Sequence, residues 1–300
     1  MGRRLTTAIA VFCLPAIVPG SSAAGGNPPT LAACGETLWI TSDAGVVEAD
    51  AATGRTLRIL QASRPYATGV VCAAGRAYVS SVESGYVASA VDRFDAHTGR
   101  RTRIDTRSGG IFGIALASGR LFVIAGSTTL RVVELAHGGQ PERAFANGHP
   151  AWISGGSALT IVDESGALRR RAGDGHERVL ASGAGWPAVA CGSGILAAAP
   201  GRVRLVGGAT PWSAPGRPVA LACDHASAWV ATTDASGLRT TVRRRHLSDG
   251  RTLRGVHIAG SAVAVARARR VVWIATAGST ERLVGLDPHT LRVLASRAIL

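Results

Sequence analysis

The chain of 300 residues has no lysine, one methionine and two asparagines, and aromatic residues make up only 5% of it. Charged residues are also few, at 17%, whereas hydrophobic residues reach 46%, which excludes a wholly disordered chain. All 33 basic residues are therefore arginine, and with 19 acidic residues they give a net charge of +14. Such usage is typical of a GC-rich coding sequence. The core has to be built from Ala, Val, Leu and Ile, and the 38 glycines indicate frequent turns.

The N-terminal segment has the features of an export signal. A pair of arginines (residues 3–4) precedes a mostly apolar stretch, residues 5–18, which is too short for a membrane-spanning helix of about 20 residues. Small residues follow, and we expect cleavage after Ala23 or Ala24, so that residues 1–24 form the signal peptide. An uncleaved membrane anchor is the alternative.

The mature chain, residues 25–300, is expected to be secreted or extracytoplasmic. Loss of the two N-terminal arginines would lower the net charge from +14 to +12. No later stretch is long and apolar enough to span a bilayer, so we expect no transmembrane anchor in the mature chain.

A pattern of short strands recurs seven times after the signal. In each copy, an Ala- and Val-rich run leads through a turn to a second run with a large or aliphatic residue at its centre, and two further short runs follow. The central residues are Trp39, Tyr78, Phe122, Thr160, Leu196, Trp229 and Trp273. Their spacing averages about 40 residues, which is typical of propeller blades. The sequence therefore predicts an all-β protein, a single seven-bladed β-propeller with four antiparallel strands per blade.

The first strand of each repeat is built mainly from Ala, Val, Cys and Gly. Blades converge on an axis, so the innermost strand has the least room, and we expect this strand to be the first one. Its apolar residues are consecutive rather than alternating, because neighbouring blades cover both faces of each sheet.

Two recurring turns carry a resemblance to known families. A Gly-x-Pro element precedes several first strands, for example at residues 148–150 and 216–218, and an Asp-x-x-Thr-Gly turn occurs at residues 50–54 and 95–99. Proline suits a strand start because its φ is fixed and it lacks an N–H. Together the two turns resemble those of YVTN-type, NHL-type and quinoprotein-like bacterial propellers. The resemblance covers about residues 28–300 and implies the fold, but these families have many unrelated functions.

Four cysteines remain after the signal, an even number that favours disulfides in an exported protein. Cys34, Cys72, Cys191 and Cys223 lie near the ends of the first strands of repeats one, two, five and six. First strands of neighbouring blades lie close together near the axis, so we predict the pairs Cys34–Cys72 and Cys191–Cys223. The alternative is that these cysteines fill tight positions as alanine does.

Ligands of this fold usually bind at the channel mouth, where the first strands begin. We expect the mouth to carry Asn27, Arg64, Tyr66, His149, Trp152, Trp186 and Arg217. The loops between second and third strands open on the same face and carry Asp43, Glu83, Asp163, Glu164, Asp234 and Glu281. Such a face suits a polar or anionic ligand, although each residue taken alone also fits a solvated loop.

Several chemistries have no signal in the sequence. There is no His-x-x-x-His or Cys-x-x-Cys metal spacing, no Gly-x-Ser-x-Gly turn and no phosphate loop, so we predict no metal, cofactor or catalytic residue. The arginine runs at residues 100–101, 169–171 and 243–245 lack the interleaved aromatic residues of a nucleic-acid platform. We therefore expect them on solvated faces and expect no nucleic-acid partner.

These observations predict an exported, monomeric binding module for a protein or an anionic component of the cell envelope, without evident catalysis. The alternative is a small-molecule enzyme, a lyase or lactonase with its site at the channel mouth. Streptogramin-lyase propellers have a similar plan, but their Leu-Trp-Phe-Thr-Glu strand is only partly matched by residues 38–42. A set of carboxylates and histidines able to hold a divalent cation would favour the enzyme.

Overall fold

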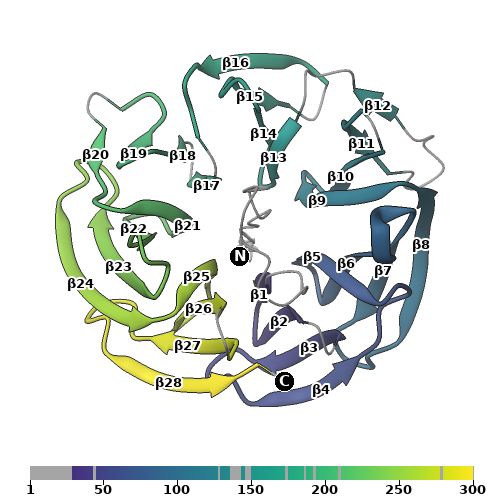
Figure 1. The fold of residues 1–300 in the computed structure, drawn as a ribbon, viewed down its shortest axis with the longest axis horizontal. Coiled ribbons are helices and arrows are strands. Elements are labelled where there is room, and N and C mark those ends of the chain that lie inside the picture. The colour runs from purple at the N-terminus through teal and green to yellow at the C-terminus, as the bar shows by residue number, and fades with distance from the viewer. Residues whose placement is uncertain are drawn as a thin grey trace, which may run out of the picture.

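The protein is a ring of seven four-stranded antiparallel sheets arranged around a common axis (Figure 1). The computed structural model describes residues 29–42, 45–127, 129–135, 143–145, 150–172, 175–185, 187–191, 194–208, 211–277 and 280–299. Within each sheet the four strands follow one another in chain order, with the first strand nearest the axis. The predicted seven-bladed, all-β propeller is confirmed. The predicted signal peptide, residues 1–24, lies outside the described residues.

Each blade is one contiguous segment of the chain. Blades 1 to 3 comprise β1 (Leu31–Cys34), β2 (Thr37–Ser42), β3 (Gly45–Asp50), β4 (Thr56–Leu60), β5 (Tyr66–Ala73), β6 (Arg76–Val82), β7 (Ala88–Asp95), β8 (Arg101–Ser108), β9 (Gly110–Ala117), β10 (Arg120–Gly126), β11 (Arg131–Glu134) and β12 (Arg143–Phe145). Blades 4 to 7 comprise β13 (Pro150–Ser154), β14 (Leu159–Asp163), β15 (Leu168–Arg171), β16 (Glu177–Ala181), β17 (Ala188–Cys191), β18 (Gly194–Ala199), β19 (Arg202–Leu205), β20 (Trp212–Ser213), β21 (Arg217–Cys223), β22 (Ser227–Thr233), β23 (Arg239–His246), β24 (Thr252–Ala259), β25 (Ser261–Arg267), β26 (Val272–Ala277), β27 (Arg282–Leu286) and β28 (Val293–Ala298). A short 3-10 turn, η1 (Ser84–Tyr86), lies between β6 and β7. In the part of the chain that the structure describes, no helix is long and apolar enough to cross a membrane.

The inner strands of five blades have a β-bulge close to their first residues. The bulged residue in blades 2, 3, 4, 6 and 7 is Thr68, Phe112, Ala151, Val219 and Val263, respectively. Each of these five side chains is half-buried, between the fully buried residues on either side. A bulge increases the local bend and twist of a strand and changes the direction of one side chain. The same irregularity therefore turns one residue per inner strand away from the core.

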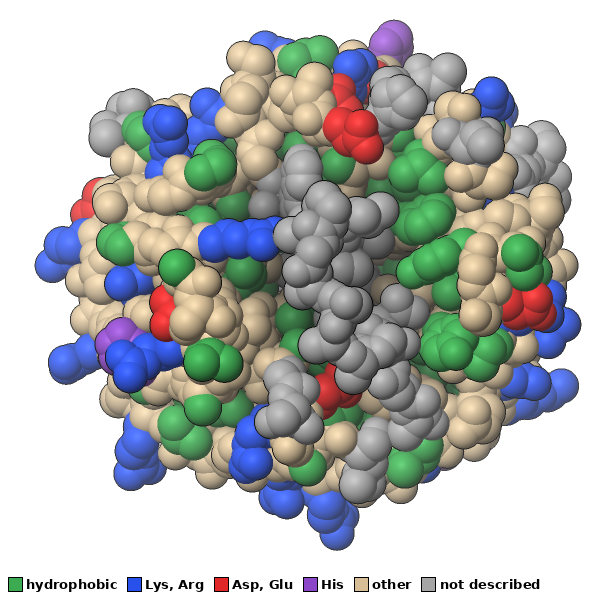
Figure 2. All heavy atoms as spheres, in the orientation of Figure 1, with side chains coloured by type: hydrophobic (Ala, Val, Ile, Leu, Met, Phe, Trp, Pro, Cys, Tyr) green, Lys and Arg blue, Asp and Glu red, His purple; other side chains and the backbone are tan. Residues whose placement is uncertain are grey.

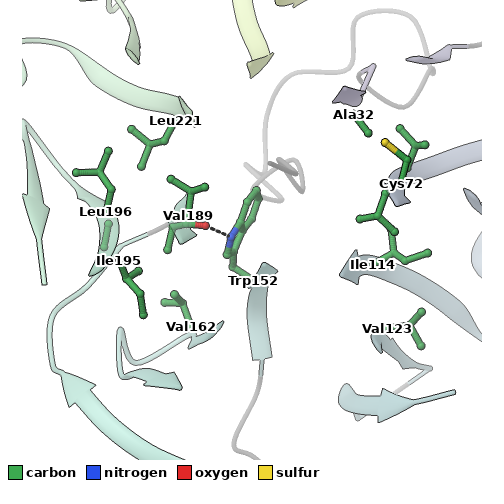
Figure 3. Packing of buried hydrophobic residues seen from close by; sticks show 14 of the residues in the cluster. Ala32, Cys72, Ile114, Val123, Trp152, Val162, Val189, Ile195, Leu196 and Leu221 are labelled. Carbon is green, nitrogen blue, oxygen red and sulfur yellow. Dashed lines mark hydrogen bonds between the residues drawn. The ribbon is translucent and has the colours of Figure 1, made fainter. Parts of the chain in front are cut away.

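The expectation of small side chains in the inner strands is wrong at several positions, since β1 contains Leu31 and β21 contains Leu221. The inner strand of blade 3 contains Ile111 and Ile114, and that of blade 4 contains Trp152. Trp152 is accommodated because its indole packs between blades 4 and 5, where Nε1 donates to the carbonyl oxygen of Ala188 at 2.9 Å (Figure 3). Space near the axis therefore limits only the side chains that point toward it.

Tryptophans at the centre of two second strands, in blades 6 and 7, connect these blades to the next one around the ring. Nε1 of Trp273 in blade 7 donates to the carbonyl oxygen of Ala51 in blade 1 at 2.8 Å, and Nε1 of Trp229 in blade 6 donates to Pro288 in blade 7 at 3.3 Å. Both acceptors directly follow the aspartate of an Asp-x-x-Thr turn. The Asp-x-x-Thr turns are thus the surfaces on which the preceding blade packs.

The aspartate fixes the shape of each of these turns. Oδ1 of Asp50 accepts hydrogen bonds from the backbone N and the Oγ1 of Thr53, at 2.8 and 2.7 Å. Asp287 holds Thr290 in the same way, at 2.7 and 2.9 Å. These bonds hold the pKa of both carboxyl groups below the ordinary aspartate value.

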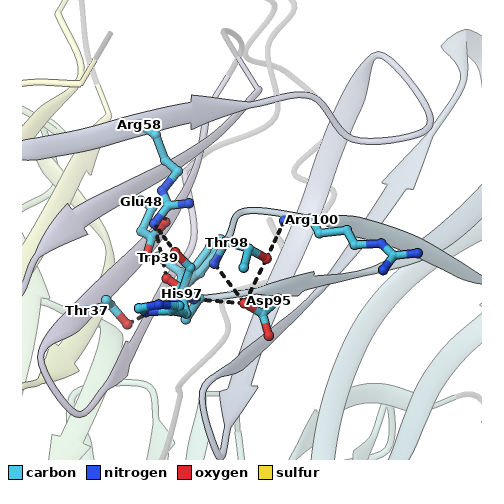
Figure 4. Close-up of polar contacts among 9 residues, drawn as sticks. Thr37, Trp39, Glu48, Arg58, Asp95, His97, Thr98 and Arg100 are labelled. Carbon is cyan, nitrogen blue, oxygen red and sulfur yellow. Dashed lines mark hydrogen bonds and ion pairs between the residues drawn. The ribbon is translucent and has the colours of Figure 1, made fainter.

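The hydrogen bonds from blade 1 to the turn of blade 2 come from an arginine and not from a tryptophan (Figure 4). Nη2 of Arg58 donates to the carbonyl oxygens of Ala96 and His97 in the turn of blade 2, at 3.2 and 3.1 Å. Its Nε lies 2.7 Å from Oε2 of Glu48, whose side chain is fully buried. Burial raises the pKa of Glu48 even though Arg58 lowers it. Trp39 turns its Nε1 to Oγ1 of Thr37 and is part of the same contact.

The ring closes between blades 7 and 1, and neither sheet contains a strand from the other end of the chain. Blade 1 consists of β1 to β4 and blade 7 of β25 to β28. A cluster of buried hydrophobic residues spans the two blades and includes Leu38, Ala266 and Trp273. Nε of Arg297 also donates to the carbonyl oxygen of Thr53 at 3.1 Å. Closure therefore depends on side-chain packing and on the turn of blade 1.

The disulfides are the two that the sequence predicts. Cys34–Cys72 joins blades 1 and 2, and Cys191–Cys223 joins blades 5 and 6, with Cα atoms 5.9 and 5.7 Å apart. In each pair the two cysteines stand one position out of step. On each inner strand, the residue that pairs with the centre of the second strand serves as the reference position. The first cysteine of each pair lies two residues after its reference position, whereas the second cysteine lies only one residue after its own. Because successive side chains point to opposite faces of a sheet, this offset turns the two sulfur atoms toward each other.

The offset predicts where a third disulfide can form. Asp224 in blade 6 and Arg267 in blade 7 hold the corresponding two positions at the next interface. We expect the variant D224C/R267C to form a disulfide that non-reducing peptide mass mapping detects, and to raise the free energy of unfolding by about 3 kcal/mol. The matched control is D224C/A268C, whose two cysteines are in step with each other and therefore face the same way. A cross-link in the control, or none in D224C/R267C, would contradict this account.

A second prediction concerns the turn of blade 1. Gly54 has a φ of +66°, and a Cβ placed there would lie 2.5 Å from the Trp273 ring. Gly75 has a similar φ of +71° but has no other heavy atom within 4 Å of its Cβ position. Both G54A and G75A should lose about 1 kcal/mol from left-handed strain, and G54A should lose roughly 1–3 kcal/mol more because it displaces Trp273. Urea unfolding compares them, and equal losses would mean that this contact does not limit stability.

Candidate functional site

The inner strands begin on one face of the ring, which we call the mouth face. The loops between second and third strands lie on the same face, whereas the Asp-x-x-Thr turns lie on the opposite one. Seen along the axis, arginine side chains surround the edge of the molecule (Figure 2). The mouth face is therefore the place to test the residues that the sequence predicts as a binding site.

Only part of the predicted site can be placed. Asn27, His149, Trp186 and Asp43 lie outside the described residues. Tyr66 and Arg217 are the first residues of β5 and β21, and Arg64 lies two residues before β5, so all three are on the mouth face. Trp152 is 1% exposed and belongs to the core between blades 4 and 5, so it contributes packing rather than a ligand contact.

Arg64 and Glu83 are brought together from two loops. Nη1 of Arg64 forms an ion pair with Oε1 of Glu83, and the two side chains are 28% and 37% exposed. The backbone N of Arg64 also donates to Oγ of Ser81 at 3.3 Å. The charge of this arginine is thus compensated within the protein, while donor and acceptor atoms stay in contact with solvent.

Two of the predicted carboxylates support their own loops. Oδ1 of Asp163 accepts from Ser165 Oγ at 2.5 Å and from the backbone N of Ala167 at 2.9 Å, and Oδ2 lies 3.2 Å from Arg169. Burial raises the pKa of Asp163, but these bonds outweigh it and hold the pKa below the ordinary value. Asp234 likewise accepts from Ser236 Oγ at 2.7 Å. Both carboxylates therefore have hydrogen-bond partners within the protein.

Arg217 differs from Arg64 because it has no ion pair with any acidic residue that the structure describes. Its side chain is exposed and lines a cavity of about 460 Å³ between blades 5 and 6. The other lining residues are Gly185, Ala198, Ala199, Pro200, Gly201, Gly216 and Pro218. This cavity combines small, mainly apolar walls with one arginine that has no ion pair to an acidic residue among those described.

The structure describes no group of three or more His, Cys, Asp or Glu residues that is able to hold a metal ion. The mouth-face carboxylates that it does describe are spread over different blades. These residues therefore offer no cation-holding set for the lyase or lactonase alternative.

The expectation that the arginine runs are solvated is wrong for Arg245, which is 6% exposed. Its Nη1 donates to the carbonyl oxygen of Gly250 at 2.9 Å, and its Nη2 donates to that of Ser213 in the preceding blade. Burial lowers the pKa of Arg245, and the nearby Arg243 lowers it further. This arginine stabilises the contact between blades 5 and 6.

Tyr86 and Phe112, which no sequence motif singles out, have rings that are stacked on the mouth face. Phe112 is the bulged residue of β9, and Tyr86 ends η1 in the loop between β6 and β7. Their rarity in a chain that is only 5% aromatic is the one signal that points to them. Which aromatic residues reach the surface depends on the bulge and on the loop conformation.

Comparison with solved structures shows the fold. No protein-family model matches the chain, and no curated protein matches it. The β-propeller domain of Cps50 (Swd1) from Myceliophteria thermophila is similar with a TM-score of 0.63 and 11% identity, covering 95% of this chain and 98% of that one. Dihydro-heme d1 dehydrogenase NirN in complex with DHE has a TM-score of 0.60 and 12% identity over 98% of this chain and 68% of that one. AztD from Citrobacter koseri has a TM-score of 0.55 and 13% identity, covering 90% and 86%.

The hydrogen bonds of Asp163 predict a pH-dependent contribution to stability. Its pKa is lowered on folding, so the stabilisation is complete above the ordinary aspartate value and is lost as the pH falls through the folded-state pKa. We expect D163N to lower the free energy of unfolding at pH 7 by about 1–3 kcal/mol, with a smaller difference from the wild type in acid. Denaturant unfolding at several pH values tests this. The control is E164Q, in an exposed neighbouring residue, and a pH-independent loss in D163N would contradict the assignment.

Proposed function

We propose that the chain is an exported binding module that holds a protein or an anionic component of the cell envelope at its mouth face. The observation that carries the proposal is Arg217, a cation without an ion pair to a described acidic residue, beside a cavity of about 460 Å³. A guanidinium presents five N–H donors in a plane and suits carboxylate or phosphate groups. The apolar walls suit the remainder of such a ligand.

The overall charge supports the same ligand class. A net charge of +14, or +12 without Arg3 and Arg4, attracts anionic polymers and speeds their encounter with the protein. Long-range attraction alone does not select a site, because arginines lie all around the ring (Figure 2). The cavity beside Arg217 supplies a place where a bound group is also partly enclosed.

Export is supported by the sequence of residues 1–24 and by the two disulfides, since disulfides persist mainly in oxidising compartments. The Gly-x-Pro and Asp-x-x-Thr-Gly turns support a relationship to YVTN-type, NHL-type or quinoprotein-like propellers. The fold itself is consistent with a binding module, because propellers of this kind serve many partners.

Export has a direct test. Expression of the full chain in a bacterial host should release a processed protein whose N-terminus begins after Ala23 or Ala24. N-terminal sequencing and intact mass identify the cleavage point. A chain that stays in the cytoplasm with its leader intact would contradict the proposed location.

Binding is tested by co-sedimentation of the mature chain with isolated cell-wall sacculi, before and after removal of their anionic polymers. We expect R217A to reduce the bound fraction about tenfold, since it removes the guanidinium that lines the cavity. The matched control is R254A, which also removes an exposed arginine, from the outer strand β24, and has the same net charge as R217A. Equal loss in both variants would show that only net charge matters.

A second measurement separates the two classes of partner. Cross-linking from a residue next to the cavity, in an envelope extract, should capture a defined protein if the partner is a protein. The proposal would be overturned if R217A still captured the same protein and the mature chain did not bind to sacculi.

A further inference from the structure

Tyr86 is unusual among the described aromatic residues because 42% of its surface is exposed. The described tryptophans, in contrast, are at most 6% exposed; they are Trp39, Trp152, Trp212, Trp229 and Trp273. Hydrophobic side chains gather beside the axis over the region of β5, β6 and β9 (Figure 2). Because aromatic residues are rare in this chain, the exposure of the Tyr86 ring on the mouth face needs a physical explanation.

The ring of Tyr86 is held by a second aromatic ring and by a glycine. It is stacked on Phe112 with the ring centroids 5.3 Å apart and the planes at 22°. A Cβ on Gly110 would lie 2.6 Å from the Phe112 ring and 3.1 Å from the Tyr86 ring. Both rings therefore occupy space that any larger residue at position 110 would take.

The backbone of Tyr86 is strained, with a φ of +58°. Such a conformation is uncommon for a bulky residue and costs of order 1–3 kcal/mol. Hydrogen bonds impose it: the N of Tyr86 donates to the carbonyl oxygen of Glu83 at 3.0 Å, and the N of Gly109 donates to that of Val87 at 3.0 Å. The loop thus holds the ring in a fixed, exposed position instead of burying it.

The loop that carries Tyr86 also carries Glu83, whose carbonyl oxygen accepts from the N of Tyr86 and whose side chain forms the ion pair with Arg64. Glu83 lies at the start of the same loop, and the two side chains are partly exposed, at 28% and 37%. The pair offers both N–H donors and a carboxylate acceptor, yet its net charge is zero. An anion gains little here because Glu83 offsets the attraction of Arg64. A neutral ligand with many hydroxyl groups can use the donor and the acceptor at once.

We propose that Tyr86, Phe112 and the Arg64–Glu83 pair form a saccharide-binding subsite on the mouth face. The flat aromatic face packs against the C–H face of a pyranose ring, while the ion pair exchanges hydrogen bonds with its hydroxyl groups. Fixing the ring before binding removes part of the entropy cost of association. This subsite lies at blades 2 and 3 and does not depend on the Arg217 cavity at blades 5 and 6.

The test uses calorimetric or NMR titration of the mature chain with three neutral probes: cellotriose, maltotriose and tri-N-acetylchitotriose. We expect at least one probe to bind, and Y86G to weaken that binding about tenfold or more. Glycine suits the positive φ, so Y86G should fold at least as stably as the wild type, which separates loss of the ring from loss of the fold. Y86F keeps the ring and should keep most of the affinity.

Two further variants sharpen the result. E83Q removes the acceptor charge and should weaken saccharide binding, whereas R217A should leave it unchanged, so failure of this proposal is distinguishable from failure at the Arg217 cavity. Binding of none of the three probes at millimolar concentration overturns the proposal. Unchanged affinity in Y86G, or Tyr86-dependent binding of a proline-rich peptide with the saccharides inert, also overturns it.

Discussion

The contact between a large side chain of one blade and the turn of the next is the constraint on which the ring depends. It is chemically varied: Trp273 bonds to Ala51 across the closing interface, whereas Arg58 reaches the turn of blade 2. At blades 5 and 6 a Cβ on Gly250 would lie 2.0 Å from Trp212, a residue of the outer strand β20. In each of these contacts the glycine of the turn has no side chain, so the turn packs directly against a large flat group of the preceding blade.

These contacts constrain the loops on the two faces of the ring to different extents. The Asp-x-x-Thr turns are fixed by their aspartates and covered in part by the preceding blade, so changes there act on stability. The mouth-face loops carry charges that are paired internally, such as Arg64 and Asp163, and also Arg217, which has no acidic partner among the described residues. Loops on a rigid scaffold are where binding residues concentrate in proteins generally. The position of Arg217 and of Tyr86 on the mouth face follows from the same arrangement.

The sequence predicts the features that repeat and misses those that depend on side-chain direction. The seven second-strand centres, from Trp39 to Trp273, recur about every 40 residues and are sufficient for blade number. The blade positions of the cysteines are sufficient for disulfide pairing. Trp152 is misplaced because a strand residue points to one face or the other by a single step of register, and the bulge at Ala151 alters that step. Tyr86 is missed because its exposure results from a left-handed backbone that spacing does not reveal.

Arginine shows why residue type alone cannot locate a site in this chain. With no lysine, every cation is an arginine, so one residue type has to meet structural and functional needs alike. Arg245 is buried against backbone carbonyls and acts in packing, Arg64 is neutralised by Glu83, and Arg217 has no described acidic partner. The free energy available to an anionic ligand differs accordingly, because an arginine whose charge is already compensated gives little further attraction. The partner of each guanidinium, rather than its presence, therefore determines which part of the ring recognises charge.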